Sequence, residues 1–274
     1  MSTLPTIFDR LQTAGVTHKY YFNNLPYLAF WGLKYISSTA LFSEFLTSAA
    51  AGTLPSVSFI DPRYTILDDG TGNDDHPHAD IRNGEAFLSE IYRAVATGPA
   101  WSKTVLIITF DEWGGFFEHV APPRLTPATA HDLDTDQVNG QVLLGFRVPT
   151  VIVSPFTVNT QNTPAVTDTV FDHTSILKLI EWRWSLQPLT QRDGSSQIGN
   201  LATSLNFTPS SIVPNLPPAN SVFALPCFGG GIFSSSASSM STEWAAFAGT
   251  PHVQQWLQHP AFGSSVPGDW LPGR

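Results

Sequence analysis

VLIITFDEWGGFFEH, residues 105–119, joins a continuous apolar run directly to two adjacent carboxylates. Upstream, residues 85–97 place apolar side chains at helical spacing. A helix that leads into an uninterrupted apolar run is typical of a buried, parallel strand. We therefore predict a strand over Val105–Phe110. Its carboxyl end carries Asp111 and Glu112, at the position where open α/β sheets bind their ligands.

The residue types at this strand end favour a metal ion. Two adjacent acids repel each other unless a cation joins them, and hard carboxylate oxygens suit Ca²⁺, Mg²⁺ or Mn²⁺. The glycines at 114 and 115 allow the backbone to approach a bound group. We therefore predict Asp111 and Glu112 as ligands of one divalent metal ion. The alternative is two solvated acids that open a loop with a glycine turn, because acids on loops are usually exposed.

The segments around this run alternate between strand-like and helix-like patterns. The apolar run Val148–Val153 stops at Ser154-Pro155, and helical spacing follows over Ser175–Trp184. Toward the N-terminus, the same patterns predict helices over Thr6–Gly15 and Ser43–Ala51 and strands over Lys19–Phe22 and Val57–Ile60. Strands that alternate with helices indicate an α/β layered domain.

A second polar cluster, NDDHPHAD, occupies residues 73–80 and packs three acids and two histidines into eight positions. Asp74 and His78 are four residues apart, as metal ligands can be. His76 could donate a hydrogen bond to a phosphate oxygen or act as a general acid. The alternative is a solvated polar loop that caps a helix beginning near Asn83, because loops concentrate such residues whatever their function.

The third candidate is FDHTSILKLIEW, residues 171–182. Asp172 or Thr174 can cap the helix that follows. His173 lies at the helix N-terminus, beside unpaired backbone amides and the positive end of the dipole, a place that favours anions. The sequence leaves three roles open for it: a phosphate contact, a metal ligand or a surface histidine.

Composition narrows the possible partners. Lys and Arg number 13 against 22 Asp and Glu, and the net charge of −9 argues against nucleic acid, which is held by basic residues. No apolar run approaches the roughly 18 residues of a membrane span, and the N-terminus shows no signal peptide, so we expect a soluble chain. The single cysteine, Cys227, excludes an intramolecular disulfide.

The amino-acid composition of the chain changes near Asn206. Residues 1–206 carry the predicted strands and helices, whereas residues 207–274 are rich in Pro, Ser and Gly. This composition is typical of loops, although Glu243–Leu257 could add a broken amphipathic segment around Pro251. We therefore expect a catalytic domain over 1–206 and a C-terminal extension over 207–274.

Taken in order, NDDHP, ITFDEWGGFFEHVAPP, RVPTVIVSPF and FDHTSILKLIEWRW resemble the motifs of the phosphoesterase family, which includes bacterial phospholipases C, plant non-specific phospholipases C and acid phosphatases. The resemblance covers roughly Pro5–Asn206. It implies an alkaline phosphatase-like fold, a three-layer α/β/α sandwich with a mostly parallel central sheet. It also implies metal-dependent hydrolysis of phosphate ester bonds, in a small molecule or a phospholipid headgroup.

The resemblance also assigns roles to residues. Asp111 and Glu112 would be the metal ligands, while Asp75, His76, His119 and His173 would line the phosphate pocket. The three histidines would be catalytic, since they could stabilise the phosphoryl oxygens and protonate the leaving alcohol.

This chain departs from the family pattern at three places. Trp113 stands where many relatives have His, and Glu118 stands where Asp commonly precedes the histidine. Family members also carry, before the region that matches Thr6, a long segment with an acidic-Asn metal motif and the Ser or Thr nucleophile. Helix capping explains Thr174 and Ser175 more simply than a nucleophilic role.

We therefore expect this chain to hold half of an active site, and by itself to hydrolyse p-nitrophenyl phosphate weakly or not at all. The alternative function is a catalytically inactive metal- or phosphate-binding protein on the same scaffold. Many relatives are secreted, so the localisation stays open, as does the oligomeric state.

Overall fold

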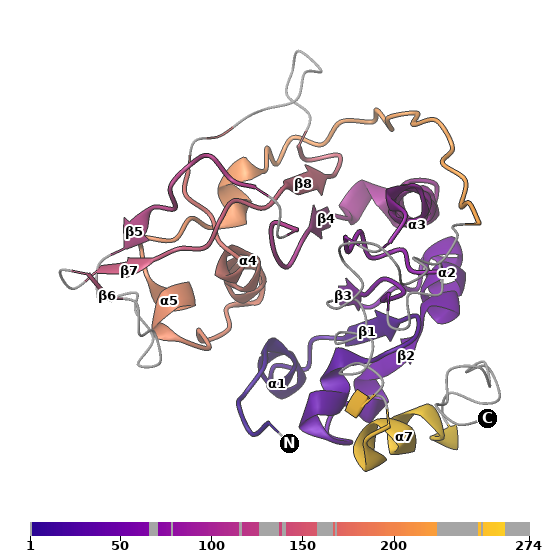
Figure 1. Ribbon diagram of the computed structural model, residues 1–274. Coiled ribbons are helices and arrows are strands. Elements are labelled where there is room, and N and C mark those ends of the chain that lie inside the picture. Colours follow the sequence, from indigo (N-terminus) through magenta and orange to yellow (C-terminus); the bar gives the residue numbers. More distant parts are fainter. Residues whose placement is uncertain are drawn as a thin grey trace. The chain divides into compact units, whose positions relative to one another are not determined.

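The structure is a computed structural model that describes residues 2–65, 71–77, 79–114, 117–125, 137–138, 141–157, 167, 169–223, 246–247 and 249–260 (Figure 1). The chain forms two compact units. The first unit comprises residues 1–4, 17–100 and 214–274, and the second comprises residues 5–16 and 101–213. The division at residues 206 and 207 rests on composition and stays a prediction.

A small parallel sheet forms the centre of the first unit. Its strands are β1 (His18–Phe22), β2 (Thr39–Leu41) and β3 (Val57–Ile60), in the order β2-β1-β3. Tyr20 lies opposite Thr39 on one side and Phe59 on the other, and both pairings are parallel. The predicted strands over 19–22 and 57–60 are thus confirmed. Strand β2 is only three residues long and was not predicted.

Helices cover this sheet within the first unit. Helix α2 (Phe42–Ala51) packs on β1 and β2 and contacts α3 (Ile81–Ala96), where the Phe42 and Phe87 rings lie 5.1 Å apart. Gly52 ends α2 in the left-handed region, with φ of 70°, as the sequence predicts. Two 3₁₀ helices, η1 (Tyr27–Trp31) and η2 (Ile36–Ser38), precede β2.

The C-terminal segments of the chain also pack on the first unit. Helix α7 (Pro251–Leu257) contacts η1, and its buried Trp256 donates through Nε1 to the Gly32 carbonyl oxygen. Pro251 was expected to break this segment. It instead starts the helix, because the first helical turn needs no amide donor from it.

Two strands of the second unit correct the expected sheet direction. Strand β4 (Leu106–Thr109) pairs with β8 (Thr150–Val153), but the pairing is antiparallel, with Leu106 opposite Val153. The side chains of β4 are half-buried rather than fully buried. The prediction of a buried parallel strand was wrong, because an apolar run does not determine the direction of the neighbouring strand.

A second antiparallel sheet and several helices complete the second unit. Its strands are β5 (Arg124–Leu125), β6 (Gln137–Val138) and β7 (Gln141–Leu143), in the order β5-β7-β6. Leu125, Val142, Leu144 and Ile198 form a buried cluster. The helices are α1 (Ile7–Thr13), η3 (Trp101–Lys103), α4 (Thr174–Trp184), α5 (Gln191–Gly194) and η5 (Leu201–Ser204).

Helix α1 matches its sequence prediction closely. Thr6 and Asp9 form a capping box, and Ile7, Phe8 and Leu11 are buried. Arg10 donates through Nη2 to the carbonyl oxygen of Pro188, at 3.1 Å.

The described residues therefore form a mixed α/β structure with a small parallel sheet and two antiparallel ones. The mostly parallel central sheet of a three-layer sandwich is not seen in this part of the chain. Within the same residues, no helix is both long and apolar enough to cross a membrane.

Candidate functional site

The carboxyl end of β4 brings together three of the predicted site residues. Asp111 and Glu112 follow the strand with exposed side chains, and the Glu112 amide donates to Asp111 Oδ1 at 3.1 Å. His173 lies just before α4, and its Nε2 is 2.8 Å from the carbonyl oxygen of Phe110. The imidazole is thus held beside the residue that precedes Asp111.

The donor chemistry at this strand end fits a hard divalent cation. Asp111 and Glu112 offer carboxylate oxygens, the ligand type that Ca²⁺, Mg²⁺ and Mn²⁺ prefer. Among the described residues, no group of three or more His, Cys, Asp and Glu side chains is arranged to hold a metal. The pair thus fits part of a coordination shell, which for Ca²⁺ contains roughly six to eight oxygens.

His119 belongs to a second arrangement in the same unit. The Glu118 carboxylate accepts two hydrogen bonds from Arg147, from Nε and Nη2, both at 2.7 Å. It also accepts from the amides of His119 and Val120, at 2.7 and 3.0 Å. The Arg147 hydrogen bonds, followed by the Val120 amide, lower the pKa of Glu118 to about 2. Glu118 therefore stays ionised and fixes the backbone of His119.

The imidazole of His119 is exposed, and its Nδ1 lies 3.5 Å from Glu118 Oε1. Among the described contacts, none joins this ring to Asp111 or His173. The departure from Asp to Glu at position 118 therefore preserves an anion that holds the histidine segment. The catalytic role of His119 stays a prediction.

The other two predicted pocket residues, Asp75 and His76, lie in the first unit. Their loop is held by Asp74, whose carboxylate accepts from the Thr65 amide at 2.6 Å and from the Thr65 hydroxyl at 2.7 Å. The same carboxylate accepts from the His76 amide at 3.3 Å. Asp74 thus shapes the loop, and His78, its suggested partner in metal binding, lies outside the described residues.

Asp75 has an unusual environment for a carboxyl group. Its backbone φ is 56°, in the left-handed region, and its side chain lies against Gly84 of α3. Asp75 Oδ1 is buried and has no hydrogen-bond partner among the described residues. Burial, followed by the charges of Glu85 and Asp74, raises the pKa of Asp75.

Sequence reasoning missed a cluster at the carboxyl end of the parallel sheet. Asp61 follows β3 directly and accepts a hydrogen bond from the Tyr20 hydroxyl. Burial, followed by the charge of Asp61, raises the pKa values of Tyr20 and Tyr64. The buried Asn24 pairs with both backbone groups of Tyr64, at 2.9 and 3.1 Å. This cluster anchors the start of the loop that carries Asp75.

The sequence signal for this cluster was partial. Asp61-Pro62 marks a strand end, but nothing in the local pattern indicates that Tyr20 reaches Asp61. The predicted site residues therefore form two groups, Asp75 with His76 in one unit and the other four in the other. Their convergence on a single phosphate pocket stays a prediction.

Comparison with known proteins identifies relatives of the chain. The sequence model described as the phosphoesterase family matches residues 1–187. Non-specific phospholipase C6 of Arabidopsis thaliana is 37% identical over 202 residues, which cover 69% of this chain and 39% of the relative. Phospholipase C A of Mycobacterium tuberculosis is 34% identical over 189 residues, 63% of this chain and 34% of the relative. The chain thus spans well under half the length of these relatives.

Proposed function

Because the chain belongs to the phosphoesterase family, we propose that it contributes to phospholipase C-type hydrolysis of phosphate ester bonds, with a divalent metal ion on Asp111 and Glu112. The observation that carries the proposal is the hydrogen bond between His173 and the Phe110 carbonyl oxygen. It holds an imidazole at the strand end that bears both carboxylates. The bound metal would polarise the phosphoryl group.

The same hydrogen bond assigns a proton to His173. A carbonyl oxygen can only accept, so Nε2 is the donor and carries the hydrogen in the neutral ring. Nδ1 is then the nitrogen that can take up or release a proton at the reacting phosphate. His173 is therefore our candidate for general acid or phosphate contact.

The names of the relatives favour a phospholipid headgroup ester as the substrate over a phosphomonoester. In the first unit, Asp75 and His76 stay our predicted phosphate contacts. His76 follows Asp75 directly and would donate to the phosphate.

A second candidate function arises because neither hydroxyl group next to His173 in the chain is suited to act as the nucleophile. The Thr174 hydroxyl donates to Asp172 Oδ1 at 2.6 Å. The Ser175 hydroxyl is fully buried and accepts from the Asp172 amide at 3.1 Å. Both groups serve the helix cap, which disfavours them as the nucleophile. We therefore retain the alternative of a metal- or phosphate-binding protein without turnover.

Metal binding and turnover separate these functions. Titration with Mn²⁺, followed by electron paramagnetic resonance, should show one site that is lost in Asp111→Asn and Glu112→Gln. Glu90→Gln, an exposed acid on α3, is the matched control and should leave binding unchanged. Unchanged Mn²⁺ binding in Asp111→Asn would refute the metal assignment.

Hydrolysis of phosphatidylcholine and of p-nitrophenyl phosphate should be assayed on the same samples. We expect weak turnover or none by the isolated chain. Mn²⁺ binding without any turnover would support the binding-protein alternative. Rapid metal-dependent hydrolysis that Asp111→Asn abolishes would show that the chain contains a complete active site.

A further inference from the structure

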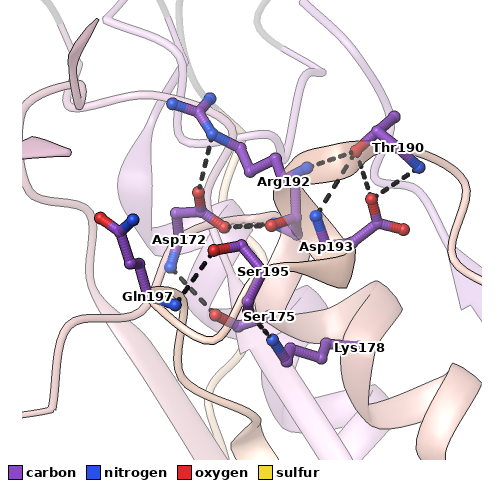
Figure 2. Close-up of polar contacts among 9 residues, drawn as sticks. Asp172, Ser175, Lys178, Thr190, Arg192, Asp193, Ser195 and Gln197 are labelled. Carbon is purple, nitrogen blue, oxygen red and sulfur yellow. Dashed lines mark hydrogen bonds and ion pairs between the residues drawn. The ribbon is translucent and has the colours of Figure 1, made fainter. Parts of the chain in front are cut away.

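Residues 188–200 of the second unit fold back along α4, and we call them the clasp. They lie beyond residue 187, where the match to the family model ends. The clasp is fixed to α4 at several points, and Figure 2 shows the one between Lys178 and Ser195. The Leu189 amide donates to Glu181 Oε1 at 3.3 Å, and Lys178 Nζ donates to the Ser195 carbonyl oxygen. Asn200 Nδ2 donates to the Lys178 carbonyl oxygen at 3.3 Å.

The short helix α5 inside the clasp is held rigidly by its own cap. Asp193 is 1% exposed, and its carboxylate accepts from the amides of Leu189 and Thr190, at 2.7 and 2.8 Å. The Thr190 hydroxyl in turn accepts from the amides of Arg192 and Asp193. These reciprocal bonds fix the backbone from which the Arg192 side chain extends.

Arg192 reaches from the clasp to the residue before His173. Its Nε lies 3.5 Å from Asp172 Oδ2 in an ion pair, and both atoms are buried with no hydrogen-bond partner among the described residues. The Arg192 and Asp172 side chains are 25% and 14% exposed, so water screens this ion pair only partly. Loss of either partner would leave a largely buried charge uncompensated, which a protein tolerates poorly.

Asp172 transmits this contact to His173 through the backbone on both sides of it. Its Oδ1 accepts from the Thr174 amide at 2.7 Å, while its own amide donates to Ser175 Oγ at 3.1 Å. Figure 2 shows Asp172 between Arg192 and Ser175. The His173 ring, which bonds the Phe110 carbonyl oxygen, therefore extends from a backbone that Asp172 holds in place.

We propose that Arg192 is a positioning residue that holds the His173 imidazole at the end of β4 by fixing Asp172. Its significance for catalysis rests on the function proposed above. The geometric claim is independent of metal binding and of turnover. The clasp then serves the site through Asp172.

The test reads the ring of His173 directly by ¹⁵N nuclear magnetic resonance, with assignment through His173→Gln. In the wild-type chain, we expect the Nε2–H form to predominate, since Nε2 donates to Phe110. Arg192→Gln should shift the ring signals and raise the share of the Nδ1–H form several-fold. Arg192→Lys restores the positive charge and should return the signals most of the way to those of the wild type.

Two further variants keep the proposal open to refutation. Arg183→Gln removes an exposed arginine from α4 and should leave the His173 signals unchanged. Asp172→Asn keeps an oxygen for the Thr174 amide but removes the charge that faces Arg192, so it should reproduce the Arg192→Gln shift. It also decides the question if Arg192→Gln does not fold.

Unchanged His173 signals in a folded Arg192→Gln or Asp172→Asn variant would overturn the proposal. Equal shifts in Arg183→Gln would do the same, because they would indicate a general effect of lost charge. The two proposals can fail separately. If the wild-type chain does not bind Mn²⁺ but the His173 signals shift in Arg192→Gln, the proposed function fails and the positioning role stands. If Mn²⁺ binds but the His173 signals do not shift, the positioning role fails.

Discussion

Replacing Gly84 with alanine should destabilise this protein, although alanine is the better helix former. In a helix, glycine costs up to about 1 kcal/mol relative to alanine. A methyl group at Gly84, however, would lie 2.6 Å from Asp75 Cγ and 2.9 Å from Oδ2, and closer still to Oδ1. Forcing extra volume into a packed contact costs roughly 1–3 kcal/mol. We therefore expect a net loss of up to about 2 kcal/mol.

Making the same substitution in the Asp75→Gly variant isolates the cause of this loss of stability. Asp75→Gly removes the colliding carboxyl group and tolerates the left-handed backbone at φ of 56°. In that background, Gly84→Ala should stabilise the protein, since only helix propensity remains. The measurement is urea unfolding of the four proteins in a double-mutant cycle. Equal stabilisation by Gly84→Ala in both backgrounds would refute the contact between Asp75 and α3.

Two further predictions concern carboxyl groups of the second unit. Burial, followed by the hydrogen bond and charge of Asp193, raises the pKa of Glu181 to about 8. Between the ordinary pKa of a glutamate and this value, the folded state therefore holds a proton that the unfolded state has released. The contribution of Glu181 to stability should therefore be largest at acidic pH and fall as the pH rises to about 8, and Glu181→Gln should flatten this decline in thermal unfolding. Arg147→Gln should raise the pKa of Glu118 toward its ordinary value, measured by ¹³C carboxyl titration, and an unchanged pKa would contradict the ion pair.

Local patterns were sufficient to predict the longer helices and four of the strands, but not the 3₁₀ helices or the short strands β2, β5, β6 and β7. Helix α1 has a capping residue, an apolar stripe and a terminal glycine, and all three signals lie within ten residues. The pairing of β4 with β8 could not be predicted in the same way. Its direction depends on how the chain between them returns, which no local period encodes.

Only part of the candidate site could be predicted, again because contacts between distant segments leave no local pattern. Asp111, Glu112 and His173 stand out because their residue types occur at a strand end and a helix start. The contact that brings His173 to Phe110 spans 63 residues, and only the folded structure reveals it. The role of Arg192 could not be predicted from the sequence. Its partner, Asp172, lies at the start of another helix, and an ion pair between distant residues leaves no repeating pattern in the sequence.

The contact between α1 and the loop before α5 has a consequence for how the protein is made. Arg10 and its acceptor, Pro188, are 178 residues apart in the chain. At about 5–20 residues per second, a ribosome needs roughly 10 to 35 seconds to synthesise the chain between Arg10 and Pro188. During that time Ile7, Phe8 and Leu11 lack much of the surface that later buries them. The interval between the synthesis of α1 and that of Pro188 is therefore a stage at which a chaperone or slow, dilute expression would help this chain.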